Sequence, residues 1–278
     1  MQLPVGYYNF SENFGRLTGC IVKRGNKVNE YIMDDGIRLH IKTDMPKGFS
    51  GKCPLVIVIH GFTGHMEERH ITAVAAMLNE IGYATLRVDM YGHGLSGGVF
   101  RDHTLFKWLS NVMTILDYVK TMPEISRIYL VGHSQGGLTA VLAGAMEKDR
   151  VSGLIPLSPA LMIPEEARRG VLLGNKLDLC HLEGEFSAKD GWILGGNYVR
   201  VAQTINVEDA IKRFDGPVLI VQGEADKSVP EPYVKEKAKL FADCRYVSIP
   251  DETHCYDNHL DTVVEVLRNY ILEKKWNE

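Results

Sequence analysis

One pentapeptide has the composition of a serine nucleophile site. Residues 132–136 read GHSQG, a G-x-S-x-G string with Ser134 at its centre. A serine at a sharp strand-to-helix turn can attack a carbonyl carbon, because such a turn lifts its hydroxyl above the sheet. The string alone decides little, since a second copy, GLSGG, occupies residues 94–98 around Ser96.

The flanking segments distinguish the two copies. Ser134 follows the apolar run IYLV at residues 128–131 and precedes GLTAVLA at residues 137–143, as a nucleophile elbow requires. Ser96 lies in a glycine-rich loop and is followed by VFRD. We therefore predict that Ser134 is the nucleophile and that Ser96 belongs to a structural turn. A helix N-cap is the structural alternative for Ser134, and the two roles are compatible.

A serine hydroxyl needs a general base, and the base needs a carboxylate that orients it. At an elbow of this kind the chain order is Ser, then Asp or Glu, then His. His181, His254 and His259 follow Ser134. His254 comes directly after a predicted last strand at residues 244–250, at the carboxyl edge of the sheet where sites collect. We predict that His254 is the base and that the other two lie on the surface.

The orienting carboxylate is expected in the loop after the apolar run at residues 218–221. Asp226 is the best candidate in that loop, and Glu224 is the local competitor, more typical of a turn residue. Asp251 and Asp257 flank the predicted base in sequence. We interpret both as loop acids, because neighbours in sequence are poorly placed to bond the imidazole Nδ1.

Acyl transfer also requires two backbone N–H donors for the oxyanion, one just after the nucleophile and one in an earlier loop. The first predicted donor is Gln135. The second is Phe62, because the run at residues 55–59 ends in HGFTG, whose glycines let the backbone approach a substrate closely. His60 precedes the nucleophile in the chain, so we predict a structural role for it.

Short apolar runs alternate with helical patterns along the rest of the chain. The runs are typical of strands buried on both faces of a parallel sheet and occupy residues 55–59, 84–88, 128–131, 154–157 and 218–221, and a last strand is predicted at residues 244–250. Helical periodicity occupies residues 70–81, 105–119, 138–145, 233–241 and 260–272. This alternation predicts βαβ units. An antiparallel hairpin is predicted from residues 28–33 and 37–41, which flank Asp34-Asp35-Gly36.

Residues 160–206 interrupt this alternation. They contain no strand of comparable strength, and a structureless loop of that length would be unusual in a compact domain. We therefore predict a single domain over residues 1–278 with an inserted lid or cap at residues 160–206.

Composition excludes several classes of protein. The formal net charge is -4 with both signs spread along the chain, so nucleic acid is not expected as a partner. No apolar run approaches the roughly 20 residues of a membrane helix, and residues 1–8 lack the pattern of a secretory signal. The five cysteines include no C-x-x-C pair, so neither a disulfide framework nor a metal site is expected. These features predict a cytoplasmic protein that binds a small molecule, without a membrane partner, and they leave a homodimer open.

The motifs together resemble those of the α/β hydrolases. They stand in that family's order as HGF at 60–62, DMYGHGLS at 89–96, GHSQG at 132–136, GEAD at 223–226 and TH at 253–254. More narrowly, the chain resembles the bacterial cinnamoyl (feruloyl) esterases in HGFT at 60–63, YLVGHSQGG at 129–137 and LGGNYVRVAQ at 194–203. The resemblance implies an α/β-hydrolase fold with a mostly parallel central sheet, flanking helices and an inserted lid. It also implies a serine esterase that needs no cofactor.

The resemblance further implies a lid that binds the phenolic end of a hydroxycinnamate. Tyr198 matches a lid tyrosine that faces the phenol, and Glu165 or Glu166 falls near a lid acid. Residues 168–185 depart from the pattern, with leucines where polar residues are expected. Feruloyl or cinnamoyl ester hydrolysis is therefore the main hypothesis. A monoacylglycerol lipase or other short-acyl esterase, a ligand-binding protein without turnover, and acyl transfer to an acceptor other than water are the alternatives.

Overall fold

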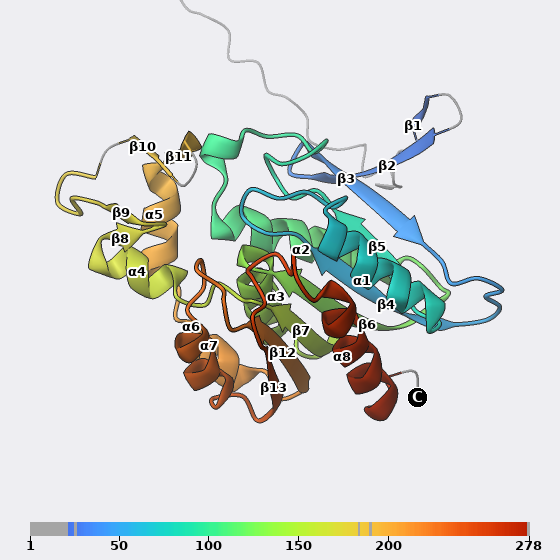
Figure 1. Cartoon of the computed structure of the whole chain (residues 1–278). Helices are drawn as coiled ribbons and strands as arrows, with labels where there is room; N and C mark the ends of the chain where they lie inside the picture. The colour runs from blue at the N-terminus through green and yellow to red at the C-terminus, as the bar shows by residue number, and fades with distance from the viewer. Residues whose placement is uncertain (1–21, 25–26, 183, 189–190, 277–278) are drawn as a thin grey trace, which may run out of the picture.

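A nine-stranded sheet runs through the computed structural model, which describes residues 22–24, 27–182, 184–188 and 191–276 (Figure 1). Its spatial order is β1-β2-β3-β5-β4-β6-β7-β12-β13. The strands are β1 (Val22–Arg24), β2 (Lys27–Asp34), β3 (Ile37–Asp44), β4 (Cys53–Ile59), β5 (Ala84–Val88), β6 (Ile125–His133), β7 (Val151–Leu157), β12 (Pro217–Gly223) and β13 (Asp243–Ile249). From β5 to β13 the neighbouring strands are parallel, so the predicted mostly parallel sheet is confirmed.

The predicted N-terminal hairpin is confirmed as β2 and β3. The strands pair antiparallel, with Asp34 opposite Ile37. The two loop residues, Asp35 and Gly36, both have positive φ, of 46° and 78°. This is the requirement of a type I′ turn, whose twist matches that of the flanking strands. Residues 1–8, where we expect no secretory signal, lie outside the described residues.

Helices cover both faces of the sheet. They are α1 (Arg69–Glu80), α2 (Leu105–Lys120), α3 (Gln135–Met146), α6 (Val207–Arg213), α7 (Glu231–Ala238) and α8 (Leu260–Glu273), with a 3-10 turn, η1 (Phe100–Asp102). In β4, Val56 and Val58 pack with α1 and α8, whereas Leu55, Ile57 and Ile59 pack with α2 and α3. The alternation explains why the strand reads as a continuous apolar run.

Residues 160–206 form a separate group of small elements at one end of the sheet, drawn in yellow and orange at the left of Figure 1. They are α4 (Ile163–Arg169), β8 (Val171–Leu172), β9 (Asn175–Lys176), β10 (Glu185–Ser187), β11 (Ile193–Gly195) and α5 (Gly196–Thr204). The four strands pair as two short antiparallel hairpins, and α4 packs on α5. A lid function for this group stays a prediction. Within the described residues, no helix combines the length and apolarity needed to cross a membrane.

Candidate active site

Ser134 stands at a strained turn between β6 and α3. Its backbone angles are φ 55° and ψ -118°, and a non-glycine residue with positive φ persists only where its surroundings hold it. Those surroundings are backbone hydrogen bonds. The Ser134 N–H donates to the Leu157 carbonyl at 2.8 Å, and the Ser134 carbonyl accepts from the N–H groups of Leu138 and Ala160. The turn therefore presents the hydroxyl at the carboxyl end of the sheet.

The two glycines of the string are a steric requirement of this turn. A Cβ atom on Gly132 would overlap the carbonyl of Gly136, and one on Gly136 would overlap the carbonyl of His60. Ser96, in the second copy of the string, has a different environment. Its Oγ donates to the Asp89 carbonyl and accepts from a backbone N–H at 2.8 Å, which agrees with a structural turn.

The structure brings Ser134, His254 and Asp226 into one hydrogen-bonded chain. Ser134 Oγ lies 2.9 Å from His254 Nε2, and His254 Nδ1 lies 2.7 Å from Asp226 Oδ2. Because the carboxylate can only accept, Nδ1 carries the proton and Nε2 is free to accept from the serine hydroxyl. The residues come from three loops that the parallel sheet places at the same edge, after β6, β12 and β13.

Asp226 is held as a carboxylate by its surroundings. Its Oδ1 accepts from the N–H groups of Ser228 and Val229 at 2.8 and 2.9 Å, and its Oδ2 also accepts from Gln222 Nε2 at 3.0 Å. Burial opposes ionisation, but the hydrogen bonds, led by that from His254, outweigh it and hold the pKa of Asp226 below its ordinary value. The carboxylate is therefore charged at neutral pH and can stabilise an imidazolium.

A second histidine, inside the GHSQG motif itself, fixes the loop that carries the first. His133 Nε2 lies 2.8 Å from the carbonyl oxygen of His254, so Nε2 donates and carries the single proton of a neutral ring. Burial lowers the pKa of His133 well below its ordinary value. The ring of His70 packs against His133 with the centroids 4.3 Å apart. Sequence reasoning missed this contact, which joins residues 121 positions apart.

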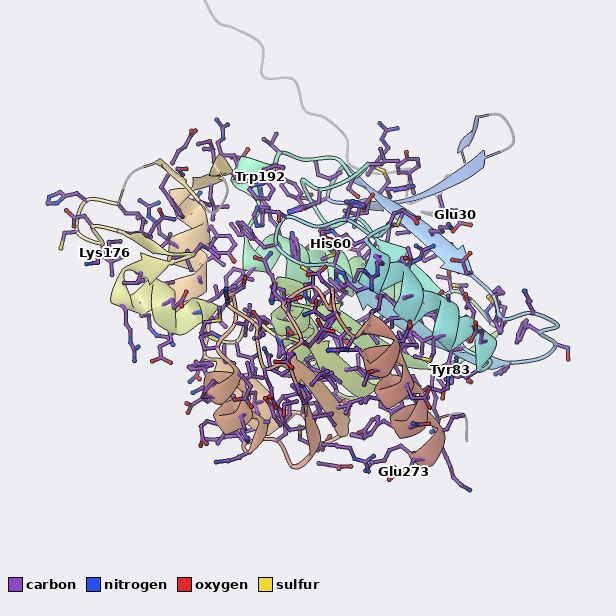
Figure 2. All side chains as sticks on the ribbon, in the orientation of Figure 1. Glu30, His60, Tyr83, Lys176, Trp192 and Glu273 are labelled. Atoms are coloured by element: carbon purple, nitrogen blue, oxygen red, sulfur yellow. The ribbon has the colours of Figure 1, made fainter. Side chains whose placement is uncertain are left out.

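The two predicted oxyanion donors face different local constraints. Gln135 is the first residue of α3, so its N–H has no acceptor within the helix. Phe62 lies in the loop after β4, where His60 Nδ1 donates to the Gly61 carbonyl at 2.7 Å and His60 Nε2 accepts from the Met90 N–H at 3.0 Å. Burial lowers the pKa of His60 to about 3, so it is a neutral interior residue near the middle of the molecule (Figure 2). It braces the peptide whose N–H is the predicted second donor.

A pocket of ≈ 260 Å³ opens beside Ser134 and His254. Its wall has a polar part, contributed by Thr63, Gly64, Glu68, His254 and Cys255. An apolar part is contributed by Ala160 in the segment after β7, Met162 and Ile163 at the start of α4, Leu173 after β8 and Val229 in the loop after β12. The pocket can therefore hold an ester with one polar and one apolar half.

Tyr198 and Glu166 do not line this pocket. Tyr198 is fully buried, its hydroxyl donates to Gln135 Oε1 at 2.6 Å, and its ring meets that of Phe62 edge-on. Glu166 is half-buried on α4, and burial raises its pKa. Burial raises the pKa of Tyr198, and the charge of Glu166 raises it further. Contact of either with a substrate stays a prediction.

The residues that the sequence assigned to the surface are found there. Glu224, Asp251, Asp257 and His259 are exposed, and His181 is exposed and bonded to a neighbouring aspartate. Among residues that the structure describes, no group of three or more His, Cys, Asp or Glu side chains is arranged to hold a metal ion.

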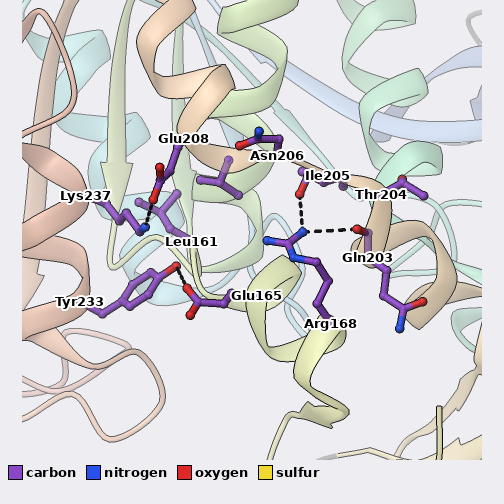
Figure 3. Close-up of a pocket in the computed structure, with 11 residues that line it drawn as sticks. Leu161, Glu165, Arg168, Gln203, Thr204, Ile205, Asn206, Glu208, Tyr233 and Lys237 are labelled. Carbon is purple, nitrogen blue, oxygen red and sulfur yellow. Dashed lines mark hydrogen bonds and ion pairs between the residues drawn. The ribbon is translucent and has the colours of Figure 1, made fainter.

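A larger pocket of ≈ 680 Å³ lies between α4, α6 and α7 (Figure 3). Its charged side chains are paired within the protein. Tyr233 donates to Glu165 at 3.0 Å, Lys237 bonds Glu208, and Arg168 donates to the Ile205 carbonyl at 2.8 Å. The pocket contains neither Ser134 nor His254, so we place the chemistry in the smaller one.

Comparison with known proteins identifies relatives of this chain. A family model described as serine aminopeptidase, S33, matches residues 52–182. Est1E from Butyrivibrio proteoclasticus, solved with bound ferulic acid, is 56% identical, with a TM-score of 0.86 over 87% of this chain and 98% of that chain. The mitochondrial palmitoyl-protein thioesterase ABHD10 of Homo sapiens is 32% identical over 123 residues, 43% of this chain and 39% of the relative. The monoglyceride lipase of Rattus norvegicus is 29% identical over 205 residues, 62% and 65% of the two chains.

These matches cover different shares of the proteins compared. The chain spans only about two fifths of the length of the thioesterase relatives. By contrast, it covers nearly all of Est1E at high identity and with the same arrangement of sheet and helices. The predicted fold and family are confirmed by that match. The chain belongs to the α/β-hydrolase family of serine ester hydrolases, together with Est1E.

Proposed function

We propose that the chain is a carboxylic ester hydrolase that cleaves hydroxycinnamate esters through an acyl-enzyme on Ser134. The observation that carries the proposal is the hydrogen-bonded chain from Ser134 through His254 to Asp226, with links of 2.9 and 2.7 Å. The choice of an aromatic acyl group is supported by the 56% identity to Est1E, a structure of which holds ferulic acid.

The proposed mechanism gives each of these residues a defined role. His254 Nε2 takes the proton of Ser134 as Oγ bonds to the ester carbonyl carbon, and Asp226 stabilises the resulting imidazolium. The N–H groups of Phe62 and Gln135 hold the oxyanion. The bond to the alcohol oxygen then breaks, and His254 gives its proton to that oxygen. Water adds to the acyl-enzyme with His254 as base, which releases the acid and restores the serine hydroxyl.

The pocket supports a compact acyl group. Its ≈ 260 Å³ is smaller than the roughly 300–1,000 Å³ of pockets that enclose drug-sized ligands. We assign the phenolic end to the proposed lid, which carries Glu166 on α4 and Tyr198 on α5. The Tyr198 hydroxyl donates to Gln135 and keeps lone pairs that can accept from a phenol.

A substrate panel tests the acyl preference. We expect kcat/KM for methyl ferulate or chlorogenate to exceed that for a long-chain monoacylglycerol by about tenfold or more, because a pocket built for a compact acyl group cannot bury a long chain. Initial rates at several concentrations of each ester measure this. A strong long-chain preference would instead favour the monoglyceride lipase reading, which rests on a 29% identical relative.

Replacing the orienting carboxylate, Asp226, tests the hydrogen-bonded chain from Ser134 through His254 to Asp226. We expect Asp226→Asn to lower kcat by about 10⁴-fold, because an amide can donate to Nδ1 and so leave the proton on the wrong ring nitrogen. Glu224→Gln is the matched control, since Glu224 is an exposed carboxylate two positions earlier in the same loop. Full activity in Asp226→Asn, or loss in Glu224→Gln, would move the role to another acid.

The alternatives in other classes have their own tests. Failure of a fluorophosphonate probe to label Ser134 would favour a binding protein without turnover, and ester products formed with added alcohols would show acyl transfer. We also propose a cytoplasmic location, supported by the absence of a disulfide bond among the four cysteines that the structure describes. A homodimer stays a prediction that sedimentation can check.

A further inference from the structure

One carboxyl group in the catalytic pocket has no function in the mechanism above. Glu68 is the N-cap residue of α1, yet its side chain makes no capping hydrogen bond to its own helix. The carboxyl group lies instead against Gly64, where a Cβ atom would overlap it. The absence of a side chain at Gly64 therefore makes the space that this carboxyl group occupies.

The position of Glu68 leaves one of its oxygens without a donor. Glu68 lines the same pocket as Ser134 and His254. Its Oε2 is shielded from solvent and has no hydrogen-bond partner within the part of the chain that the structure describes. A buried carboxylate oxygen without a donor is unfavourable, and burial correspondingly raises the pKa of Glu68. A small adjustment of this side chain on binding would let a ligand supply the missing donor.

The chemistry of the reaction indicates which half of the ester lies nearby. His254 must give its proton to the alcohol oxygen, so the alcohol leaves along the side of the pocket that contains His254. We place Glu68 on that side, because Glu68, Thr63 and Gly64 form the polar part of the wall together with His254, and the Glu68 carboxyl group lies against Gly64. The apolar wall around Met162 and Ile163 is left for the acyl half.

We propose that Glu68 is a specificity-determining residue that accepts a hydrogen bond from a hydroxyl group on the alcohol half of the ester. The enzyme then prefers esters of polyhydroxylated alcohols to esters of simple alcohols with the same acyl group. This inference rests on the proposed ester hydrolysis at Ser134.

A matched pair of esters tests the inference. n-Propyl ferulate and 1-O-feruloylglycerol share their acyl group and the three-carbon skeleton of the alcohol, and they differ only in the hydroxyl groups of that alcohol. We expect the wild-type kcat/KM ratio to favour the glyceryl ester by about tenfold or more, the effect of one hydrogen bond to a charged group. In Glu68→Leu the ratio falls to about one, chiefly through KM, and in Glu68→Gln, which keeps one acceptor oxygen, it falls part of the way.

Two further variants separate a loss of alcohol recognition from a general loss of folding or activity. Gly64→Ala displaces the carboxyl group without removing it and is expected to lower the same ratio. Glu224→Gln changes an exposed carboxylate outside the pocket and is expected to leave the ratio unchanged. Circular dichroism checks that each variant is folded. A wild-type ratio near one, an unchanged ratio in Glu68→Leu, or a parallel loss on both esters would overturn the proposal.

Failure of the acyl assignment is distinguishable from failure of this one. If the enzyme hydrolyses p-nitrophenyl acetate but neither feruloyl ester, the hydroxycinnamate proposal fails. The same ratio is then measured with n-propyl acetate and glyceryl monoacetate, and it tests Glu68 independently of the acyl group.

Discussion

Ser134→Ala is expected to lower kcat for methyl ferulate by about 10⁶-fold, which would leave only the slow background of a bound ester in water. Removing Oγ removes the atom that bonds to the carbonyl carbon, and Ser134 Oγ is the hydroxyl that lies within hydrogen-bond distance of His254 Nε2. The fold should survive, because the bonds that hold the elbow come from backbone atoms of residue 134 and not from its side chain.

Ser96→Ala is the matched control for that result. Ser96 occupies the same five-residue string but bonds backbone groups near Asp89, so its loss should cost stability and leave the activity of each folded molecule intact. A second variant, Ser134→Gly, should be as inactive as the alanine variant but more stable than it by on the order of 1 kcal/mol, because glycine relieves the positive φ of 55°. Undiminished turnover in Ser134→Ala would remove the basis of the proposed function.

The central strands could be predicted because each one leaves a local pattern in the sequence. The strands β4, β5, β7 and β12 are buried on both faces, so each appears in the sequence as an apolar run closed by turn residues. Residues 160–206 carry no such pattern. Their four strands are only two or three residues long and α4 has seven residues, too few for a periodicity to appear.

One missed helix had a usable signal. α6 begins after Asn206, whose side chain accepts from the Asp209 N–H, and Glu208 and Asp209 are acidic residues in its first turn. An asparagine followed by acidic residues is a helix start signal, and it stood at the boundary drawn for the predicted lid.

The candidate site also has features that the sequence predicts and features that only the folded chain shows. The order Ser134, Asp226, His254 could be predicted because each residue follows a recognisable strand, and parallel strands end at one edge. The contact of His133 with the His254 carbonyl depends on two loops that meet only in the folded chain. Likewise, the hydrogen bond from the Tyr198 hydroxyl to Gln135 joins residues 63 positions apart, and nothing in their local sequence indicates it.

The buried histidines around the site should make the protein sensitive to acid. Burial is the main cause that lowers the pKa of His60 and His103 to about 3 and that of His70 to about 4, against about 6.5 in an unfolded chain. Between those values the unfolded chain binds protons that the folded protein does not. Their stabilising effect is therefore complete above about pH 6.5 and is lost as the pH falls toward the folded values.

The size of the effect follows from the same linkage. Once the pH is well below 6.5, each such histidine lowers the free energy of unfolding by about 1.4 kcal/mol for every further pH unit. The three histidines together therefore lower it by about 4 kcal/mol per pH unit. A typical free energy of unfolding is about 5–15 kcal/mol, so we expect the protein to unfold near pH 4–5. The lowered pKa of Asp226 acts in the same direction but only at lower pH, below its ordinary value.

Urea unfolding at pH 7, 6 and 5 measures this dependence, and a variant assigns it. His103 is fully buried, with its Nδ1 donating to the Phe100 carbonyl at 2.6 Å, so His103→Gln should be less stable at pH 7 but lose about 1.4 kcal/mol less per pH unit. His181→Gln, which changes an exposed histidine, should leave the slope unchanged. A free energy of unfolding that stays constant from pH 7 to pH 5 would mean that these histidines are solvated or charged in the folded protein, in conflict with their burial.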